Sequence, residues 1–254
     1  MKFVTFNKDK LSKLSLGTVQ FGLDYGISNQ EGKPTQEKVN EIIDYVASNK
    51  LNCYDTAQAY GTSENVLGKA IPNTDRTFII SKLKSNLFEN NVNKNISISL
   101  SNLSISSLYG LLLHDSELLY SWEKKHSLIV DNLKNSGKIK YFGVSIYSDG
   151  DFQLAVRNDK INFIQIPFNI FDQRAITLEW FKKAKEKNKL IFIRSVFLQG
   201  LILMDIKKLP PSLKIAEKYI RYLEEYCLEL KMTKNELALA FVDSVANDSL
   251  ILFG

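Results

Sequence analysis

Short apolar runs alternate with longer amphipathic stretches along almost the whole chain, and these two patterns predict strands and helices in turn. The first run, residues 14–21, is apolar almost throughout, as in a strand that is covered on both faces. After Thr35, apolar residues from Val39 to Val46 recur at spacings of three and four, which is the stripe of an amphipathic helix. The same alternation then repeats as far as residue 253.

This pattern predicts eight strands, at residues 14–21, 51–54, 77–82, 107–113, 139–145, 161–166, 190–195 and 249–253. Besides the helix after Thr35, it predicts helices at residues 64–70, 92–103, 122–135, 152–157, 178–188 and 215–230, and a last one opened by the capping box of Thr233 and Glu236. Strands that alternate with helices pair in parallel through right-handed crossovers, so the expected fold is α/β, a parallel eight-stranded (β/α)8 TIM barrel.

The length of the chain suits one such barrel. Its 254 residues match the roughly 250 that are typical of this architecture, and we expect residues 1–254 to form a single domain. Residues 1–8 alternate apolar and polar side chains, so we expect them to form one strand of a hairpin that closes the barrel floor.

Four chemically active side chains stand at the ends of three successive predicted strands. Asp55 and Tyr60 follow the second strand, Lys82 ends the third and His114 follows the fourth. Because catalytic groups of parallel barrels sit at the C-terminal ends of the strands, we expect a carboxylate, a phenol, an ammonium and an imidazole to meet at one barrel mouth.

The sequence around these residues resembles the aldo-keto reductase family. The resemblance lies in Asp55-Thr56-Ala57 followed by Ala59-Tyr60-Gly61, then in Lys82 and His114, and it extends from about residue 16 to residue 254. It implies that Asp55, Tyr60, Lys82 and His114 form the catalytic tetrad of the family. It also implies NAD(P)H-dependent reduction of an aldehyde or ketone, such as a sugar-like carbonyl compound, to an alcohol.

Carbonyl reduction requires a hydride for the carbon and a proton for the oxygen. The nicotinamide supplies the hydride, and the protein positions the cofactor and provides the proton. A nearby ammonium favours the phenolate form of a tyrosine, so Lys82, held by Asp55, would make Tyr60 a workable general acid. His114 would donate a hydrogen bond to the carbonyl oxygen and orient it.

Each of these residues also has a structural interpretation. Asp55 can cap the turn before Thr56, Tyr60 can be half-buried packing, and Lys82 can be a solvated lysine at a strand end. His126 is expected at the surface of a helix. The order of four residues at three successive strand ends favours the catalytic interpretation of the tetrad.

Further positions are matched to the cofactor by the same resemblance. Ser145 and Gln165 correspond to residues that bind the nicotinamide carboxamide, while Ile146 stands where many relatives have asparagine. Arg194 takes the place of an aromatic ring that stacks on the nicotinamide, and a planar guanidinium can stack as well. The pyrophosphate would be approached by backbone groups of the turn that contains Ser195, Leu198 and Gly200. NADPH is the expected cofactor, with NADH as the alternative.

Composition and charge exclude several other classes. The two cysteines, Cys53 and Cys227, build no disulfide framework, so a cytoplasmic location is expected. No apolar run approaches the ~20 residues of a membrane span. The net charge of +5 is spread along mixed helical faces rather than gathered in a basic stripe, which argues against nucleic acid as a partner. The expected partner is a small carbonyl substrate; no metal ligands are predicted and the oligomeric state is left open.

One departure from the family pattern concerns the last strand. Related barrels continue beyond it into a segment that holds the 2′-phosphate of the cofactor, and the sequence ends at Gly254. The sequence therefore predicts a barrel truncated after its eighth strand, with apolar surface of that strand exposed. This leaves a second hypothesis, a catalytically weak barrel that serves as a nicotinamide-binding or regulatory subunit, and a weaker third one, a cofactor-independent isomerase or lyase.

Overall fold

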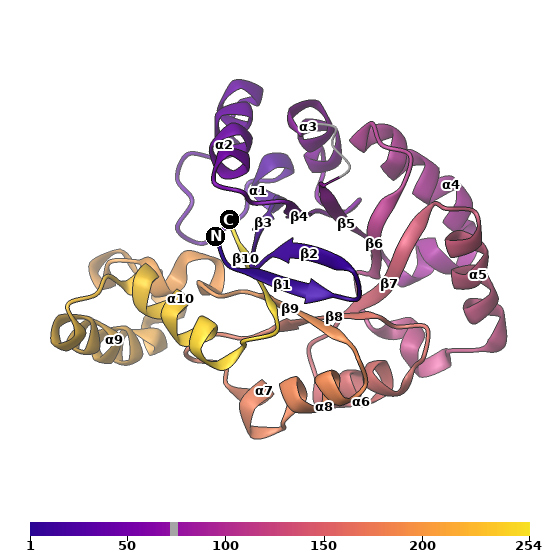
Figure 1. The fold of residues 1–254 in the computed structure, drawn as a ribbon. Helices are drawn as coiled ribbons and strands as arrows, with labels where there is room; N and C mark the ends of the chain where they lie inside the picture. The colour runs from indigo at the N-terminus through magenta and orange to yellow at the C-terminus, as the bar shows by residue number, and fades with distance from the viewer. Residues whose placement is uncertain (72–75) are drawn as a thin grey trace.

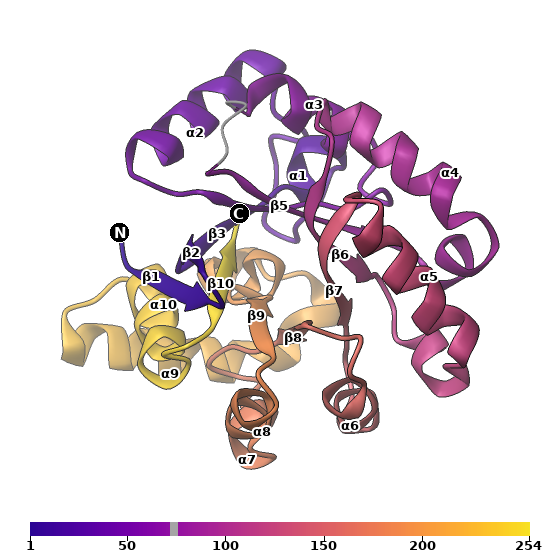
Figure 2. The ribbon, with the colours of Figure 1, turned by 45° about the vertical axis from the view of Figure 1, so that its right-hand side comes forward.

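The computed structural model describes residues 1–71 and 76–254 and shows a closed parallel barrel surrounded by helices (Figures 1 and 2). Its strands follow one another around the barrel in chain order, and the last pairs with the first to close it. The barrel strands are β3 Leu14–Gly17, β4 Cys53–Asp55, β5 Phe78–Leu83, β6 Leu108–Leu113, β7 Ile139–Ser145, β8 Phe163–Pro167, β9 Leu190–Arg194 and β10 Leu250–Phe253. The predicted eight-stranded α/β barrel is confirmed.

Helices connect the strands and cover the outside of the barrel (Figure 2). The α-helices are α1 Val19–Gly22, α2 Gln36–Ser48, α3 Ser63–Ala70, α4 Ser85–Leu103, α5 Lys124–Asn135, α6 Asp149–Arg157, α7 Arg174–Thr177, α8 Trp180–Glu186, α9 Glu217–Leu230 and α10 Lys234–Val245. Short 3-10 helices are η1 Glu117–Ser121, η2 Leu198–Leu203, η3 Ile206–Lys208 and η4 Pro211–Ala216. The apolar stripe predicted for the first long helix is buried at Val39, Ile43 and Val46 of α2.

An antiparallel hairpin closes the N-terminal end of the barrel, as the alternating pattern of residues 1–8 predicts. It consists of β1 Phe3–Phe6 and β2 Asp9–Ser12, and it crosses the barrel in Figure 1. Val4, Phe6 and Leu11 are buried against the inside of the barrel. The Phe6 ring meets the ring of Phe163 on β8 edge-on, at 5.4 Å between centroids.

The first barrel strand ends four residues earlier than its apolar pattern predicts. The chain leaves the sheet at Thr18. The N–H and the hydroxyl of this residue both donate to the Asp55 carbonyl oxygen, each at 3.0 Å. Residues 19–22 then form the short helix α1, in which Phe21 and Gly22 are buried. An apolar run alone does not distinguish a strand from a buried helical turn, and this explains the error.

Two predicted helices also differ from the structure. The helix predicted at residues 92–103 begins at Ser85, and its φ of −149° at Asn91 marks a kink within α4. The helix predicted at residues 178–188 is α8, which begins only at Trp180 because Glu179 lies in the left-handed region with φ 57°, and the separate short helix α7 precedes the predicted range.

The eighth strand is covered, contrary to the prediction that it leaves apolar surface exposed. Leu250 and Ile251 are 0% and 1% exposed, and Leu252 is 8% exposed. The side chains of β10 alternate between two apolar clusters, with Ile251 in the outer one and its neighbours in the inner one. The N–H of Ile251 also donates to the Lys13 carbonyl oxygen, which ties the strand to the floor of the barrel.

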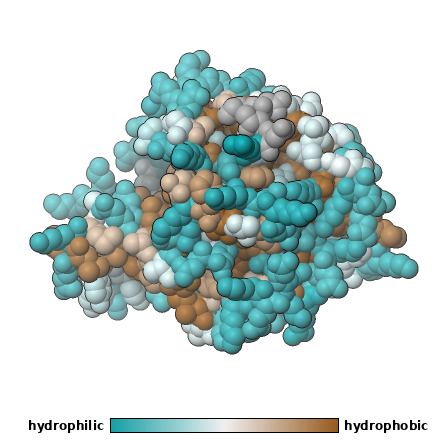
Figure 3. Space-filling view, viewed as in Figure 1, coloured by the Kyte–Doolittle hydropathy of each residue, from teal (hydrophilic) through white to brown (hydrophobic). Residues whose placement is uncertain are grey.

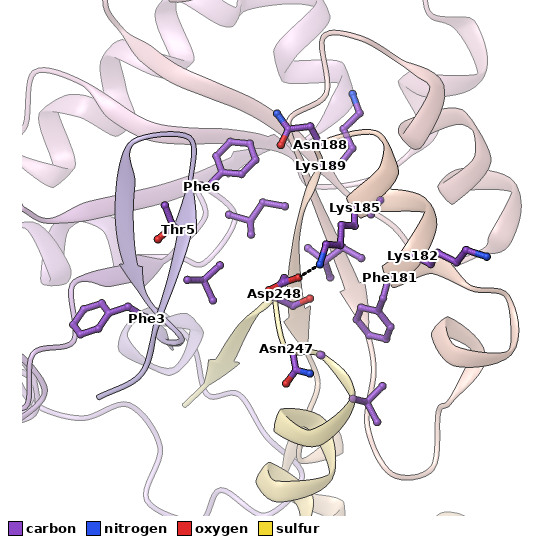
Figure 4. Close-up of a pocket in the computed structure, with 17 residues that line it drawn as sticks. Phe3, Thr5, Phe6, Phe181, Lys182, Lys185, Asn188, Lys189, Asn247 and Asp248 are labelled. Carbon is purple, nitrogen blue, oxygen red and sulfur yellow. Dashed lines mark hydrogen bonds and ion pairs between the residues drawn. The ribbon is translucent and has the colours of Figure 1, made fainter.

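A cavity of about 600 Å³ lies at the floor end of the barrel, between the hairpin, α8 and the segment after α10 (Figure 4). Its charged groups already have partners: Lys185 forms an ion pair with Asp248 at 2.6 Å, and Lys189 donates to the carbonyl oxygens of Asn158 and Ile161. None of the helices in the described ranges is long and apolar enough to cross a membrane.

Candidate active site

The four tetrad residues lie together at the C-terminal rim of the barrel. Asp55 is the last residue of β4, Lys82 lies next to the end of β5, and His114 directly follows β6. Tyr60 lies in the loop after β4, where its N–H donates to the Ala57 carbonyl oxygen at 3.0 Å. Three neighbouring parallel strands thus deliver side chains to one rim, as the sequence predicts.

Asp55 and Lys82 form a buried ion pair with a complete set of hydrogen bonds. Lys82 Nζ lies 2.5 Å from Asp55 Oδ1 and donates to the Thr56 carbonyl oxygen at 2.8 Å, and the two side chains are 0% and 4% exposed. The other carboxylate oxygen accepts from Gln165 Nε2 at 2.9 Å. Burial by itself disfavours the charged lysine, but the charges of Asp55 and Tyr60 outweigh it and raise the pKa of Lys82.

Tyr60 is in contact with this ammonium. Lys82 Nζ lies 3.4 Å from Tyr60 Oη and 4.9 Å from the centre of its ring. The loop that carries Tyr60 packs closely on α1. A Cβ added at Gly22 would lie only 1.8 Å from the Tyr60 carbonyl oxygen, so no side chain fits at this position. A single side chain, Lys82, therefore bridges the carboxylate and the phenol.

His114 packs edge-on against the Tyr60 ring, at 5.4 Å between ring centroids. Burial, followed by the positive charge of Lys82, lowers the pKa of His114 to about 4. Its Nδ1 atom is buried without a hydrogen-bond partner in the described ranges, and its ring lines a cavity at the barrel mouth. The imidazole is therefore neutral at physiological pH and offers one N–H.

The mouth of the barrel holds a cavity of about 620 Å³. Of the residues selected from the sequence, eight line it: Asp55, Tyr60, His114, Ser145, Gln165, Arg194, Ser195 and Gly200. Lys82 lies beneath it. Leu198 does not line it, because the side chain packs against the core and the N–H donates to the Ser195 carbonyl oxygen at 3.1 Å.

Ser145 and Gln165 face each other across the β7–β8 pair, where they are register partners. Both are buried, at 3% and 1% exposed. The bond from Gln165 to Asp55 was not predicted, and it joins a residue selected for cofactor binding directly to the tetrad.

The turn after β9 has an unusual backbone. Ser195, Leu198 and Gln199 have φ values of 62°, 49° and 57°, and Gly200 has 89°. The N–H of Gly200 is used within the turn, where it donates to the Phe197 carbonyl oxygen. The N–H groups of Ser195, Val196 and Phe197 find no acceptor among the residues that the structure describes, and all three residues line the cavity.

Arg194 lines the cavity between this turn and the strand β7. Its Nη2 donates to the Ile146 carbonyl oxygen at 3.1 Å and its Nη1 to Ser195 Oγ at 3.3 Å. The Tyr147 ring covers one face of the guanidinium, with 4.1 Å from Cζ to the ring centre. Sequence reasoning missed Tyr147, although its position two residues after Ser145 places it on the same rim.

His126 is buried, which corrects the prediction of a surface histidine. It is 1% exposed, and its Nδ1 accepts from the Glu123 N–H at 2.9 Å in a capping box at the start of α5. Its role is thus to accept a hydrogen bond from a backbone N–H at the start of α5. Over the described part of the chain, no group of three or more His, Cys, Asp or Glu side chains could hold a metal ion.

Comparison with known proteins agrees with this arrangement. The model of the aldo/keto reductase family matches residues 13–254. The chain belongs to the aldo/keto reductase family. The resemblance inferred from the tetrad motif is thereby confirmed, and the match includes all the strands of the barrel.

Two curated relatives are similar in sequence to this aldo/keto reductase. An uncharacterized oxidoreductase of Bacillus subtilis, YqkF, is 22% identical over 207 residues, which cover 76% of this chain and 67% of the relative. The D-arabinose 1-dehydrogenase of Saccharomyces cerevisiae is 30% identical over 155 residues, which cover 55% of this chain and 46% of the relative. The match thus spans less than half of the yeast enzyme.

Solved structures share the fold at low sequence identity. The holo form of the aldo-keto reductase AKR11C1 from Bacillus halodurans superposes with a TM-score of 0.80 at 19% identity, over 99% of this chain and 85% of that chain. An aldo/keto reductase from Klebsiella pneumoniae in complex with NADP and acetate has a TM-score of 0.74 at 20% identity, over 99% and 84% of the two chains.

Proposed function

We propose that this chain is an NADPH-dependent reductase of aldehydes or ketones, in which Tyr60 donates the proton. The observation that carries the proposal is the position of the Lys82 ammonium, 2.5 Å from Asp55 and 3.4 Å from Tyr60 Oη. A lysine that served packing or solvation alone has no need to be fully buried between a carboxylate and a phenol at a cavity wall. The same contact stabilises a phenolate after the proton has left.

The residues of the cavity fit a nicotinamide cofactor. Ser145 and Gln165 offer a hydroxyl and an amide for the carboxamide, and the three N–H groups without acceptors in the turn after β9 suit a pyrophosphate. We therefore assign the pyrophosphate to Ser195, Val196 and Phe197, with Gly200 as the residue that permits the turn. The NADP complex of the Klebsiella pneumoniae relative supports NADPH over NADH.

The proposed reaction adds two electrons and two hydrogens to the carbonyl group. Bound NADPH supplies a hydride to the carbonyl carbon. The neutral His114 donates its Nε2–H to the carbonyl oxygen and fixes its position beside Tyr60. Tyr60 transfers its phenolic proton to that oxygen, Lys82 stabilises the resulting tyrosinate, and solvent returns the proton.

A sugar-like carbonyl compound is the proposed substrate class. The support is the similarity to a D-arabinose 1-dehydrogenase, an enzyme named for oxidation of a sugar at carbon 1. The polar lining of the cavity, with Gln20 and Tyr147 beside the tetrad, offers hydroxyl and amide partners for several hydroxyl groups.

The test begins with a titration of the purified chain with NADPH and NADH by cofactor fluorescence, followed by turnover on a panel of aldehydes, ketones and sugars. Tyr60→Phe should lower the rate about 100- to 10,000-fold, because it removes the general acid, while cofactor affinity stays the same. Tyr25→Phe is the matched control, since Tyr25 lines the same cavity but burial raises its pKa and it has no contact with Lys82. Its rate should remain within about tenfold of the wild type.

Two results would contradict the proposal. Equal loss of activity in Tyr60→Phe and Tyr25→Phe would contradict the assignment of Tyr60 as the proton donor. Binding of cofactor without turnover of any carbonyl compound by the wild type would favour the alternative, a nicotinamide-binding or regulatory subunit.

A further inference from the structure

Four large side chains form an exposed row along α9 and the turn before it. The row consists of Ile215, Tyr219, Tyr222 and Tyr226, which are 82%, 48%, 55% and 59% exposed. Their spacings of four, three and four residues place them on one face of the helix, in the pattern of a helix–helix seam. We call these four residues the tyrosine row.

Among the described residues, only Tyr219 of the tyrosine row has an aromatic contact within the fold, an edge-on approach to the Phe171 ring at 6.1 Å between centroids. A neighbouring face of the helix holds α9 in the fold through Ile220, Leu223 and Cys227, all of which are buried. α9 lies at the outer edge of the molecule, beyond α10 as seen from the barrel (Figure 1). The space-filling view shows hydrophobic residues at the surface of this lobe (Figure 3). A row of exposed aromatic residues at such an edge is typical of a contact surface.

Charged side chains beside the row form an ordered pattern. Lys218 and Glu225 are both exposed and flank the row on the same side, seven residues apart. Other charges of the helix are already paired, Arg221 with Glu217 and Glu224 with Lys234. Within the described ranges, Lys218 and Glu225 have no ion-pair partner; the Lys218 ammonium lies over the Tyr219 ring, 5.2 Å from its centre.

We propose that the tyrosine row is a homodimer interface, in which α9 of one copy packs antiparallel against α9 of a second copy across a twofold axis at Tyr222. In this arrangement Tyr222 meets its symmetry mate, and Tyr219 lies near Tyr226 of the other copy and Lys218 near Glu225 of the other copy, each pair within one residue of exact twofold register and each occurring twice. In a parallel arrangement the twofold axis runs along the helices, so the two copies of Lys218 would lie on opposite sides of the seam and neither would face Glu225 of the other copy. The charge pattern of the helix therefore matches its own antiparallel copy.

The size of the surface sets the expected strength of the dimer. One helix face is smaller than the roughly 800 Å² per partner of a standard interface, so dissociation constants of roughly 1–100 μM are expected. The aromatic residues at the centre supply most of the binding free energy, and the two ion pairs at the rim mainly set the orientation.

The first experiment measures the mass of the full chain by sedimentation equilibrium over a range of concentrations. The wild type should pass reversibly from one chain to two, and Tyr222→Glu should remain a monomer at every concentration. Leu228→Glu is the matched control, because Leu228 is 80% exposed on the same helix but points away from the row. It should dimerise like the wild type.

The second experiment tests the antiparallel orientation by charge reversal. Lys218→Glu alone and Glu225→Lys alone should each weaken the dimer about tenfold or more, because each places like charges opposite one another. An equimolar mixture of the two variants should dimerise again as a heterodimer, since every facing pair is then of opposite charge. The double variant Lys218→Glu, Glu225→Lys should also recover the wild-type affinity.

Each other outcome overturns the proposal. A wild type that stays monomeric up to about 1 mM would leave the row to a different partner. A dimer that survives Tyr222→Glu would place the interface elsewhere, and failure of the mixed variants to recover would exclude the antiparallel orientation. Circular dichroism of each variant confirms that α9 has remained folded.

Discussion

At the scale of the residue, the buried pair of Asp55 and Lys82 couples the proposed chemistry to stability. Lys82→Met would leave the Asp55 carboxylate buried without its ammonium, and breaking a buried pair in this way typically costs about 3–5 kcal/mol. We expect a loss of this size in the free energy of unfolding, measured with urea at neutral pH.

A second variant separates the loss of charge balance from the loss of volume. Lys82→Met combined with Asp55→Asn removes both charges, so most of the stability should return while activity stays absent. If the double variant were as unstable as Lys82→Met, the loss would come from packing rather than from an uncompensated carboxylate.

His114 makes stability depend on pH. Its pKa is about 4 in the folded chain, against 6.5 for an ordinary histidine, so between these values the unfolded chain binds more protons. The free energy of unfolding should therefore fall as the pH is lowered from about 6.5 to about 4, by at most about 1.4 kcal/mol per pH unit. In His114→Asn this part of the slope should vanish, as urea unfolding at several pH values would show. An unchanged slope would mean that other groups cause it.

The meeting of the proposed tetrad residues at one rim was predictable because local apolar patterns fix the strand ends. Asp55, Lys82 and His114 each sit at such an end, and parallel strands bring their ends together. The bond from Gln165 to Asp55 and the contact between Arg194 and Tyr147 were not predictable, because each joins side chains far apart in sequence and depends on rotamers. Burial of His126 likewise depends on how α5 packs, which its own sequence does not reveal.

At the scale of the element, the turn after β9 depends on Gly200. A Cβ at this position would lie 1.8 Å from Ser28 Oγ, in a backbone with φ 89°. Gly200→Ala should therefore displace the turn from the loop at Ser28 and weaken NADPH binding, as measured by cofactor fluorescence. Gly137→Ala is the matched control, since φ is 71° and nothing lies within 4 Å of its Cβ.

The two glycine variants report on different costs. Gly137→Ala should lose about 1 kcal/mol of stability from backbone strain alone. Gly200→Ala should lose more, and Ser28→Gly should restore part of it by removing the side chain that obstructs the new Cβ. If Ser28→Gly restores nothing, the contact between the two loops is not the cause.

The bounds of elements were less predictable than their existence. Residues 14–21 read as one strand because Phe21 and Gly22 are buried in a helical turn that continues the apolar run. Glu179 separates α7 from α8 because its φ is positive, and the presence of a glutamate in the sequence does not predict this conformation. In both places the tertiary environment, rather than local propensity, decides the backbone.

At the scale of the whole molecule, the hairpin and the active site lie at opposite ends of the barrel. Phe6→Ala removes a buried ring that contacts Phe163, and such truncations typically cost about 3–5 kcal/mol. The melting temperature should fall, whereas kcat and KM measured well below that temperature should remain those of the wild type. A change in KM would show that the floor and the mouth are coupled.

Closure of the barrel brings together strands from the two extremes of the described sequence, since Ile251 pairs with Leu14. During synthesis on the ribosome, β3 is therefore made early. The edge of β3 that pairs with β10 stays unpaired until β10 has been synthesised. An unpaired strand edge is a template for association with other chains. Slow translation of the second half of the message would prolong this exposure, so the yield of soluble protein should respond to codon choice there more than in the first half.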